Sequence, residues 1–207
     1  MRKVTIVDYG LGNLHSVSKS LIHVGVEVEI DTDGSRIPRA ERLVLPGVGA
    51  FADGMAGLRA RGQIAPLQQY GAENRSFLGI CLGAQLLLEE SDEFGCHPGL
   101  GIIPGRVERI AGEGVKVPHT GWAQVLPADD SASFPGLLRD LASGTWAYFI
   151  HSYQMVPRDP WQVTAVCRYG SQRITAVVQR GAICGMQFHP EKSGESGLTA
   201  LKAFALS

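Results

Sequence analysis

The sequence lacks any apolar run near the about 20 residues that span a bilayer. Its first residues, MRKVTIVDYG, include no long apolar segment and no small-residue cleavage site of the kind that ends an export signal. Charge imbalance is also lacking, because 19 Lys and Arg stand against 20 Asp and Glu, a formal charge of −1. We therefore expect a cytoplasmic protein with no membrane and no nucleic acid as partner.

Cofactor motifs are lacking as well. The glycines near Gly10 do not include the third glycine of a dinucleotide fingerprint, and no phosphate-binding P-loop occurs. The histidines show no metal-ligand spacing such as HExxH. The four cysteines form no CxxC pair, which predicts free thiols, no metal site and no cofactor: Cys81, Cys96, Cys167 and Cys184.

The chain does contain what one globular domain needs. Its 207 residues are 44% hydrophobic and 19% charged, and a chain of this length buries roughly 70% of its unfolded surface. No linker or repeat divides it, so we expect a single domain over residues 1–207. The 26 glycines suit many tight corners between strands and helices.

Short apolar runs alternate with helical spacing over the first ninety residues. This rhythm predicts an α/β fold with a parallel sheet. The expected strands are Lys3–Asp8, Val26–Ile30, Arg42–Leu45 and Phe77–Ile80, and the expected helices are Leu14–Val24, about Asp53–Tyr70, and one starting near Gly83.

The second half contains turns between strand-like runs and little helix before the end. We expect a mixed or antiparallel extension of the sheet there, closed by a helix over about Gly194–Ala205. The expected strands are Arg106–Ile110, Gly121–Leu126, Trp146–Tyr153, Trp161–Tyr169, Ile174–Gln179 and Ile183–Phe188. Because ligands of open α/β sheets bind beyond the carboxyl ends of the strands, the residues after Asp8, Leu45, Ile80 and Phe188 are the candidates.

Cys81 lies between two glycines at the junction of a strand and a helix. One interpretation is a small buried thiol at a tight corner, the common state of free cysteine. The other is a nucleophile elbow, in which the turn lifts the central side chain clear of the sheet. The positive end of the following helix would then favour the ionised thiolate. This stretch alone leaves both interpretations open.

His189-Pro190-Glu191 follows the last expected strand and favours the nucleophile. A histidine supplies a base near neutral pH, and a carboxylate two residues later orients the imidazole and stabilises its cation. We expect the proline to keep this segment extended, with His189 and Glu191 on the same side. Together with Cys81 they form a candidate Cys-His-Glu set.

The loop Pro46-Gly47-Val48-Gly49 follows the third expected strand. A glycine-rich loop there could turn backbone N–H groups toward a developing oxyanion, with the N–H of Leu82 as a second donor. By itself this segment is more simply interpreted as a turn.

With these pieces assembled, the sequence resembles the class I glutamine amidotransferases. Residues 79–85 match the GxCxGxQ motif of that family, and residues 189–191 match its HPE motif. Within the class the chain resembles most closely the glutaminase subunits of imidazole glycerol phosphate synthase, through the stretches Asp8–Leu14, Pro46–Phe51, Pro118–Trp122, Tyr148–Tyr153 and Gln187–Ser193.

The resemblance implies a fold, a reaction and a role for each matching residue. The implied fold is a flavodoxin-like, open, mixed and mainly parallel sheet flanked by helices, with antiparallel strands in the C-terminal half. Cys81 would be the nucleophile, His189 the general base and acid, and Glu191 the residue that orients His189. The oxyanion loop falls on Val48 and Gly49 with the Leu82 N–H. Bound L-glutamine would be held by Gly49, Gln85, Ser152 and Tyr153.

The resemblance also implies a partner. This is a TIM-barrel cyclase subunit, which forms a heterodimer with the glutaminase and receives its ammonia. The residues implied at the interface are Asn13, His119, Trp122 and Lys192. The resemblance further implies an oxyanion loop that is misaligned until the partner and its ligand bind. Two positions depart from the family: Ala123 replaces an asparagine after PHxGW, and Ala84 replaces a common methionine.

Two other functions remain as alternatives. The chain could be the glutaminase of another class I amidotransferase, serving anthranilate or pyridoxal phosphate synthesis, although the opening DYGxGNL disfavours this. It could also be a non-catalytic, flavodoxin-like binding module in which Cys81 is merely buried. The latter predicts slow alkylation of Cys81 and no release of glutamate.

Overall fold

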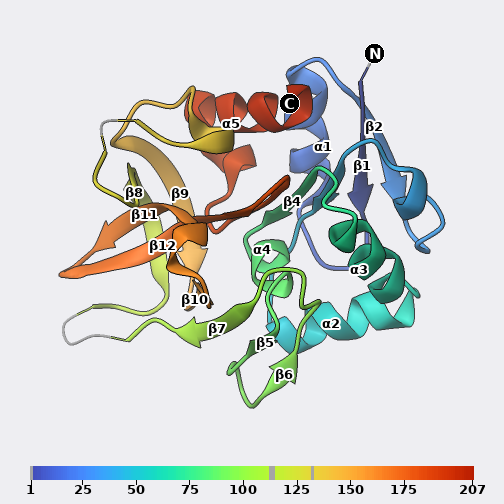
Figure 1. Ribbon diagram of the computed structural model, residues 1–207, viewed down its shortest axis with the longest axis horizontal. Helices are drawn as coiled ribbons and strands as arrows, with labels where there is room; N and C mark the ends of the chain where they lie inside the picture. Colours follow the sequence, from blue (N-terminus) through green and yellow to red (C-terminus); the bar gives the residue numbers. More distant parts are fainter. Residues whose placement is uncertain (1, 112–114, 132) are drawn as a thin grey trace.

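The computed structural model describes residues 2–111, 115–131 and 133–207. A nine-stranded sheet runs through these residues in the order β2-β1-β3-β4-β13-β12-β11-β8-β9 (Figure 1). Its strands are β1 (Lys3–Val7), β2 (Glu27–Asp31), β3 (Leu43–Leu45), β4 (Phe77–Ile80), β8 (His119–Pro127), β9 (Thr145–His151), β11 (Val163–Tyr169), β12 (Gln172–Arg180) and β13 (Ile183–Met186).

The sheet has a parallel part and an antiparallel part. Strands β2, β1, β3, β4 and β13 pair in parallel, whereas every pair from β13 outward to β9 is antiparallel. The mixed α/β sheet expected from the sequence is thus confirmed. Helical crossovers lead from β1 to β2 and from β3 to β4, whereas β2 leads to β3 through a connection with one 3₁₀ helix, Ile37–Arg39. The chain enters β13 from its antiparallel neighbour β12.

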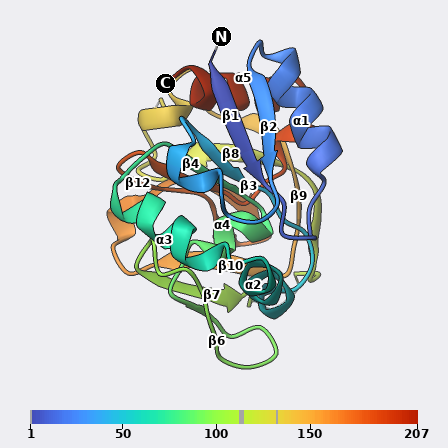
Figure 2. The same ribbon diagram turned by 90° about the vertical axis from the view of Figure 1, so that its right-hand side faces the viewer.

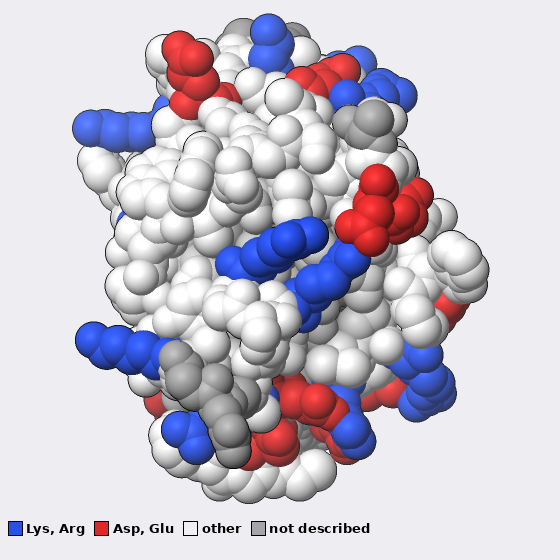
Figure 3. Space-filling model, turned by 90° about the vertical axis from the view of Figure 1, so that its left-hand side faces the viewer, with Lys and Arg blue, Asp and Glu red and all other residues white. Residues whose placement is uncertain are grey.

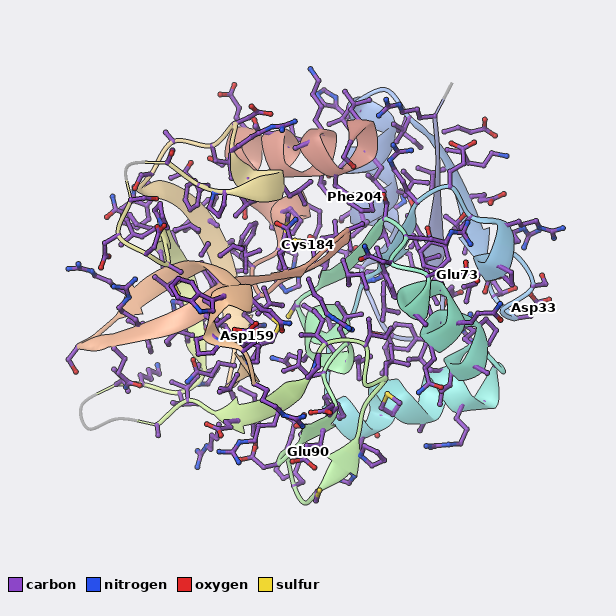
Figure 4. The ribbon with its side chains drawn as sticks, in the orientation of Figure 1. Asp33, Glu73, Glu90, Asp159, Cys184 and Phe204 are labelled. Atoms are coloured by element: carbon purple, nitrogen blue, oxygen red, sulfur yellow. The ribbon has the colours of Figure 1, made fainter. Side chains whose placement is uncertain are left out.

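Helices cover both faces of the parallel part (Figures 1 and 2). Helices α1 (Leu14–His23) and α5 (Gly194–Leu206) pack on one face. Helices α2 (Phe51–Ala60), α3 (Ile64–Ala72) and α4 (Leu82–Leu86) pack on the other. Phe204 of α5 and Cys184 of β13 belong to the same buried cluster (Figure 4). No helix within the described ranges is long and apolar enough to cross a membrane.

A second, smaller sheet corrects two sequence-based expectations. Its order is β10-β7-β5-β6, with bounds β10 (Tyr153–Pro157), β7 (Gly105–Arg109), β5 (Glu90–Ser91) and β6 (His97–Pro98). The strand expected at Arg106–Ile110 therefore lies outside the main sheet. The strand expected at Trp146–Tyr153 is divided at Ser152, because His151 pairs with His119 in one sheet and Tyr153 pairs with Arg109 in the other.

The helix expected over about Asp53–Tyr70 is also divided, into α2 and α3. Gly62 has a φ of +66° and ends the first helix. The residues on either side are tied to the ends of other strands: Arg61 donates to Asp8, and the Gln63 amide donates to Asp8 and Asp31. These contacts are tertiary, so helical periodicity alone could not locate the break.

Four short 3₁₀ helices complete the described elements: η1 (Ile37–Arg39), η2 (Gly136–Leu138), η3 (Pro160–Gln162) and η4 (Pro190–Lys192). The strand expected from Trp161 therefore begins later, at Val163. The Asp159 carboxylate accepts a hydrogen bond from the Trp161 N–H and holds that residue in the 3₁₀ turn.

Glycines allow β3 and α2 to approach their neighbours closely. A Cβ placed on Gly83 would lie 1.8 Å from the carbonyl oxygen of Leu45, and one on Gly57 would lie 2.4 Å from the carbonyl oxygen of Tyr9. Both obstacles are backbone atoms, which cannot move aside as a side-chain end can. Gly83 therefore fixes how near the first turn of α4 comes to the end of β3.

We expect Gly83→Ala to destabilise the fold strongly, because its methyl group would overlap the Leu45 carbonyl. The control is Gly25→Ala, which has a φ of +91° and open space around it. The control should lose only the about 1–2 kcal/mol of left-handed backbone strain. Urea unfolding of both variants measures the difference. Equal losses would contradict the proposed role of close packing.

Candidate active site

Cys81 occupies a strained turn between β4 and α4. Its φ of 53° and ψ of −110° lie outside the regions that non-glycine residues usually adopt. The Cys81 N–H donates to the Met186 carbonyl at 2.8 Å, which ties the turn to β13. A Cβ on Gly79 would lie 2.6 Å from the Ala84 backbone, so the turn needs glycine there. This is the geometry of a nucleophile elbow.

His189 follows β13 and is held against β9. Its N–H donates to the Tyr148 carbonyl at 2.9 Å. The Ser193 hydroxyl donates to the His189 carbonyl at 2.7 Å and accepts from the Tyr148 N–H at 3.0 Å. These three hydrogen bonds position the backbone of His189 relative to a strand of the antiparallel part.

The Glu191 carboxylate orients the His189 ring. Glu191 Oε1 lies 2.8 Å from His189 Nδ1, and the two side chains are 1% and 2% exposed. The segment is not extended as expected, because Pro190 begins the 3₁₀ helix η4 and the turn brings Glu191 back beneath the imidazole. His189 Nε2 has no hydrogen bond of ordinary geometry within the described chain. It remains available toward the pocket.

Two opposing effects set the charge of His189. Burial lowers its pKa, but the nearby Cys81 thiol and the Glu191 carboxylate outweigh burial and raise the pKa to about 9. The ring is therefore a cation near neutral pH and can stabilise a thiolate on Cys81. By contrast, burial raises the pKa of Cys167 and of Cys184 to about 12, which keeps both thiols neutral.

Cys81 and His189 open into one pocket of about 320 Å³. Of the expected oxyanion and substrate residues, all six line it: Val48, Gly49, Leu82, Gln85, Ser152 and Tyr153. A larger pocket of about 650 Å³ lies between η2, β13 and α5, but its thiol, Cys184, has no histidine among the described lining residues. Of these two pockets, the smaller is the one whose described lining residues join a thiol to an imidazole.

The Gln85 side chain holds a backbone segment that lines the pocket. Its Nε2 donates at 3.0 Å both to the Tyr153 carbonyl and to Gln187 Oε1. Gln187 Nε2 in turn lies 3.9 Å from Cys81 Sγ. The amide of Gln85 therefore holds the Ser152-Tyr153 segment next to the elbow, in addition to lining the pocket.

The four residues expected at a partner interface lie in different environments. Trp122 is 54% exposed on β8, and Lys192 places its ammonium 5.9 Å from the Tyr148 ring centre. Asn13 caps α1 by accepting from the Ser16 N–H. His119 is only 2% exposed, which is contrary to an interface role for its side chain. Its position in β8 directs the ring inward, toward His151 and Phe149.

The two departures from the family pattern concern buried positions. Ala123 is 7% exposed and pairs with Ala147 across β8 and β9, so its side chain faces the core and not a partner. Ala84 is fully buried, and its methyl group would lie 3.1 Å from a Cβ built on Gly185. Packing behind the elbow is therefore tight at Ala84.

Sequence reasoning missed three residues at the site. Glu93 lines the pocket, and its carboxylate accepts from the Phe51 N–H at 2.6 Å. Tyr9 is buried with its hydroxyl unpartnered among the described residues, and burial followed by the charge of Cys81 raises its pKa. His151 also lines the pocket. His151 ends β9 and belongs to the stretch Tyr148–Tyr153 that resembles the family, and these two signals could have drawn attention to it.

No group of three or more His, Cys, Asp and Glu in residues 2–111, 115–131 and 133–207 is arranged to hold a metal ion. The chemistry that the site itself offers is that of a thiol nucleophile beside a carboxylate-oriented imidazole.

Comparison with known families identifies the class to which this fold and site belong. The family model described as "Glutamine amidotransferase class-I" matches residues 5–206. A solved structure described as a glutamine amidotransferase shares the fold with a TM-score of 0.75 at 20% identity, covering 98% of this chain and 99% of its own. PurLQS from Thermotoga maritima shares it with a TM-score of 0.74 at 18% identity, covering 99% and 98%. The chain is a class I glutamine amidotransferase.

Closer relatives place it further within the class. Imidazole glycerol phosphate synthase subunit HisH of Moorella thermoacetica is 46% identical over 99% of this chain and 94% of its own length. The protein of the same name from Syntrophotalea carbinolica is 46% identical over 97% of this chain and 98% of its own. The chain therefore belongs to the HisH family.

We expect Glu191→Gln to lower the pKa of His189 from about 9, because the variant loses the negative charge at Nδ1. The raised pKa of His189 stabilises the wild-type fold below pH 6.5, and this contribution is lost as the pH rises through 9. Between these pH values the variant should therefore lose less stability than the wild type. NMR titration of the His189 ring measures the pKa. The exposed Glu195→Gln variant is the control and should leave it unchanged; an unshifted pKa in both would contradict this assignment.

Proposed function

We propose that this chain is the glutaminase subunit of an imidazole glycerol phosphate synthase. The observation that carries the proposal is the joining of Cys81, His189 and the carboxylate Glu191 at one pocket, in a chain 46% identical to HisH proteins. Glutamine and water would give glutamate and ammonia, and the ammonia would pass to a cyclase subunit.

The first half of the reaction forms a thioester. The Cys81 thiolate attacks the carboxamide carbon of glutamine, and the bond to nitrogen breaks after the His189 imidazolium donates its proton to the departing ammonia. The N–H of Leu82, in the first turn of α4 where helix N–H groups lack intrahelical acceptors, is a candidate donor to the oxyanion. Val48 and Gly49 border the same space and supply the second candidate donor.

The second half of the reaction releases glutamate. His189, now neutral, removes a proton from water, which attacks the thioester carbon and restores the thiolate. Glu191 keeps Nδ1 of the ring protonated, so that Nε2 is the nitrogen that exchanges the proton. Because Glu191 is buried and acts on one ring nitrogen only, it orients the imidazole throughout both halves.

The remaining lining residues match the charged end of glutamine. Glu93 carries the one carboxylate among the described lining residues and suits the α-ammonium group of the substrate. Backbone groups of Ser152 and Tyr153 lie across the pocket and suit the α-carboxylate and the carboxamide. A free amino acid, charged at one end and amide-bearing at the other, fits this arrangement.

An exposed aromatic patch beside the pocket suits the partner. We define the β8–β9 patch as Trp122, Trp146, Tyr148 and Ile150, of which Trp122, Trp146 and Ile150 are 54%, 53% and 43% exposed. Figure 3 views the molecule from the side on which β8 and β11 lie, and much of that surface is uncharged around a few basic side chains. Exposed aromatic side chains on a largely uncharged surface favour a protein partner.

In this proposal the partner is a TIM-barrel cyclase, which forms a heterodimer with the chain. Ammonia would reach it through a channel and convert the ribotide PRFAR into imidazole glycerol phosphate and AICAR, a lyase step of histidine biosynthesis. The HisH names of the relatives favour this partner over those of anthranilate or pyridoxal phosphate synthesis. The four free thiols suit the reducing cytoplasm.

Cys81→Ser should abolish glutamine-dependent turnover in the complex, with a loss of at least about 10³-fold, because a neutral hydroxyl replaces the thiolate. Synthesis from added ammonia should survive. Glutamate release and cyclase product, assayed with either nitrogen source, measure the two activities. Cys96→Ser, which changes an exposed thiol, is the matched control. Glutamine-dependent turnover retained by Cys81→Ser would refute the nucleophile assignment.

Trp122→Ala should weaken binding to the cyclase subunit by about tenfold or more, because large aromatic side chains at the centre of an interface dominate binding energy. The matched control is Trp161→Ala, a tryptophan that is 88% exposed on η3 and outside the β8–β9 patch. Titration of each variant with purified cyclase by calorimetry gives both affinities. If the two variants bind alike, the patch is not the interface.

A further inference from the structure

Two buried histidines form a chain of hydrogen bonds that ends at the pocket. His119 Nδ1 lies 3.1 Å from His151 Nε2, and His151 Nδ1 lies 2.8 Å from the carbonyl oxygen of Tyr153. The two residues are 2% and 6% exposed. The mechanism proposed above assigns no step to either histidine.

The direction of this chain follows from its last acceptor. A carbonyl oxygen can only accept, so the proton of His151 is assigned to Nδ1. Nε2 of His151 is then an acceptor, and His119 must donate from its own Nδ1. Burial lowers the pKa of His151 to about 4 and also lowers that of His119, so both rings are neutral near pH 7. One tautomer of each ring satisfies both of these hydrogen bonds.

The side chains around His119 hold its ring in the orientation that donates to His151. Its ring stacks on Phe149 at a centroid distance of 5.0 Å and lies 4.1 Å from the ring of Tyr169. Phe149 and Tyr169 come from β9 and β11, which flank β8 in the main sheet. The ring can therefore not turn away without breaking an aromatic cluster.

The acceptor of this chain has a special position in the fold. At Ser152 the backbone leaves β9 and enters β10 in the smaller sheet, and both Ser152 and Tyr153 line the pocket. The Tyr153 carbonyl accepts from His151 on one side and from Gln85 at 3.0 Å on the other. Gln85 belongs to α4, which begins at the elbow. The two donors together fix this carbonyl relative to Cys81.

We propose that His151, oriented by His119, is a positioning residue that holds the Ser152-Tyr153 backbone at the correct distance from Cys81 for substrate binding. This inference rests on the glutaminase function proposed above. It predicts that removal of the His151 donor displaces the backbone that contacts bound glutamine. The thiol, the base and the carboxylate would stay in place.

Two variants of His151 separate positioning from simple packing. The amide of asparagine places its NH₂ near Nδ1 of the histidine, whereas that of glutamine places its polar group near Nε2. His151→Asn should therefore keep the donor to Tyr153, and His151→Gln should lose it. In the complex with the cyclase subunit, we expect the KM for glutamine of His151→Gln to rise about threefold to tenfold, the worth of one hydrogen bond, with a smaller change in kcat.

His151→Asn should keep its KM within about twofold of the wild type by the same reasoning. Urea unfolding of both variants measures how much stability each loses. If His151 had only a packing role, activity would follow this loss of stability alone. A similar KM for both variants would overturn the proposal. His119→Phe, which retains a ring for stacking, should raise KM in the same direction as His151→Gln; an unchanged KM would overturn the orienting role of His119.

A spectroscopic measurement keeps this test independent of glutaminase activity. The nitrogen chemical shifts of His151 in the wild-type protein should show a neutral ring protonated at Nδ1. In His119→Phe the ring should stay protonated at Nδ1, but the Nε2 shift should move to that of an imidazole nitrogen without a hydrogen bond, because Nε2 then has no donor. A His151 ring protonated at Nε2 in the wild type would overturn the positioning proposal even if the glutaminase assignment stands. If instead the Nδ1 signature is intact but no glutamate is released, only the glutaminase assignment is overturned.

Discussion

The backbone conformation of Cys81 is the constraint on which the rest of this structure depends. A non-glycine residue with positive φ costs about 1–3 kcal/mol, and it persists only where its surroundings hold it. Here they do so through the N–H of Cys81 bonded to β13 and through glycines that let α4 approach β3 and β4. The parallel strands β3, β4 and β13 thus form the rigid base of the site. The strain turns the sulfur away from the sheet and into the pocket.

Strand β9 connects the parts of the site that act together. Its backbone binds the His189 segment, its inner face carries His151, and its outer face carries three of the four residues of the β8–β9 patch. Its end at Ser152 passes directly into the smaller sheet beside the pocket. A displacement of β9 would therefore reach the base and the substrate-binding backbone at once. In the function proposed above, a partner bound on β9 would act on both.

The site uses histidine in two opposite electrical states. The Glu191 carboxylate and the Cys81 thiol raise the pKa of His189 against the effect of burial, whereas burial leaves His151 neutral beside a second histidine and a carbonyl. The first ring can exchange protons with a substrate near neutral pH, and the second can only hold a fixed hydrogen bond. Two identical side chains that line the same pocket are therefore suited to different tasks, proton exchange and positioning, because their neighbours differ.

The sequence by itself determined the alternation of strands and helices, the elbow at Cys81, and the histidine and glutamate that accompany this cysteine. Apolar periodicity, glycine spacing and the HPE segment indicate these features because each is a signal within a short stretch of sequence. It did not determine the break between α2 and α3, the division of one expected strand at Ser152, or the burial of His119. Those features depend on hydrogen bonds and strand pairs between residues far apart in the chain, such as Gln63 with Asp31 and Tyr153 with Arg109. Only the tertiary structure decides such pairings, because each is selected by competition among all the partners that the folded chain brings within reach.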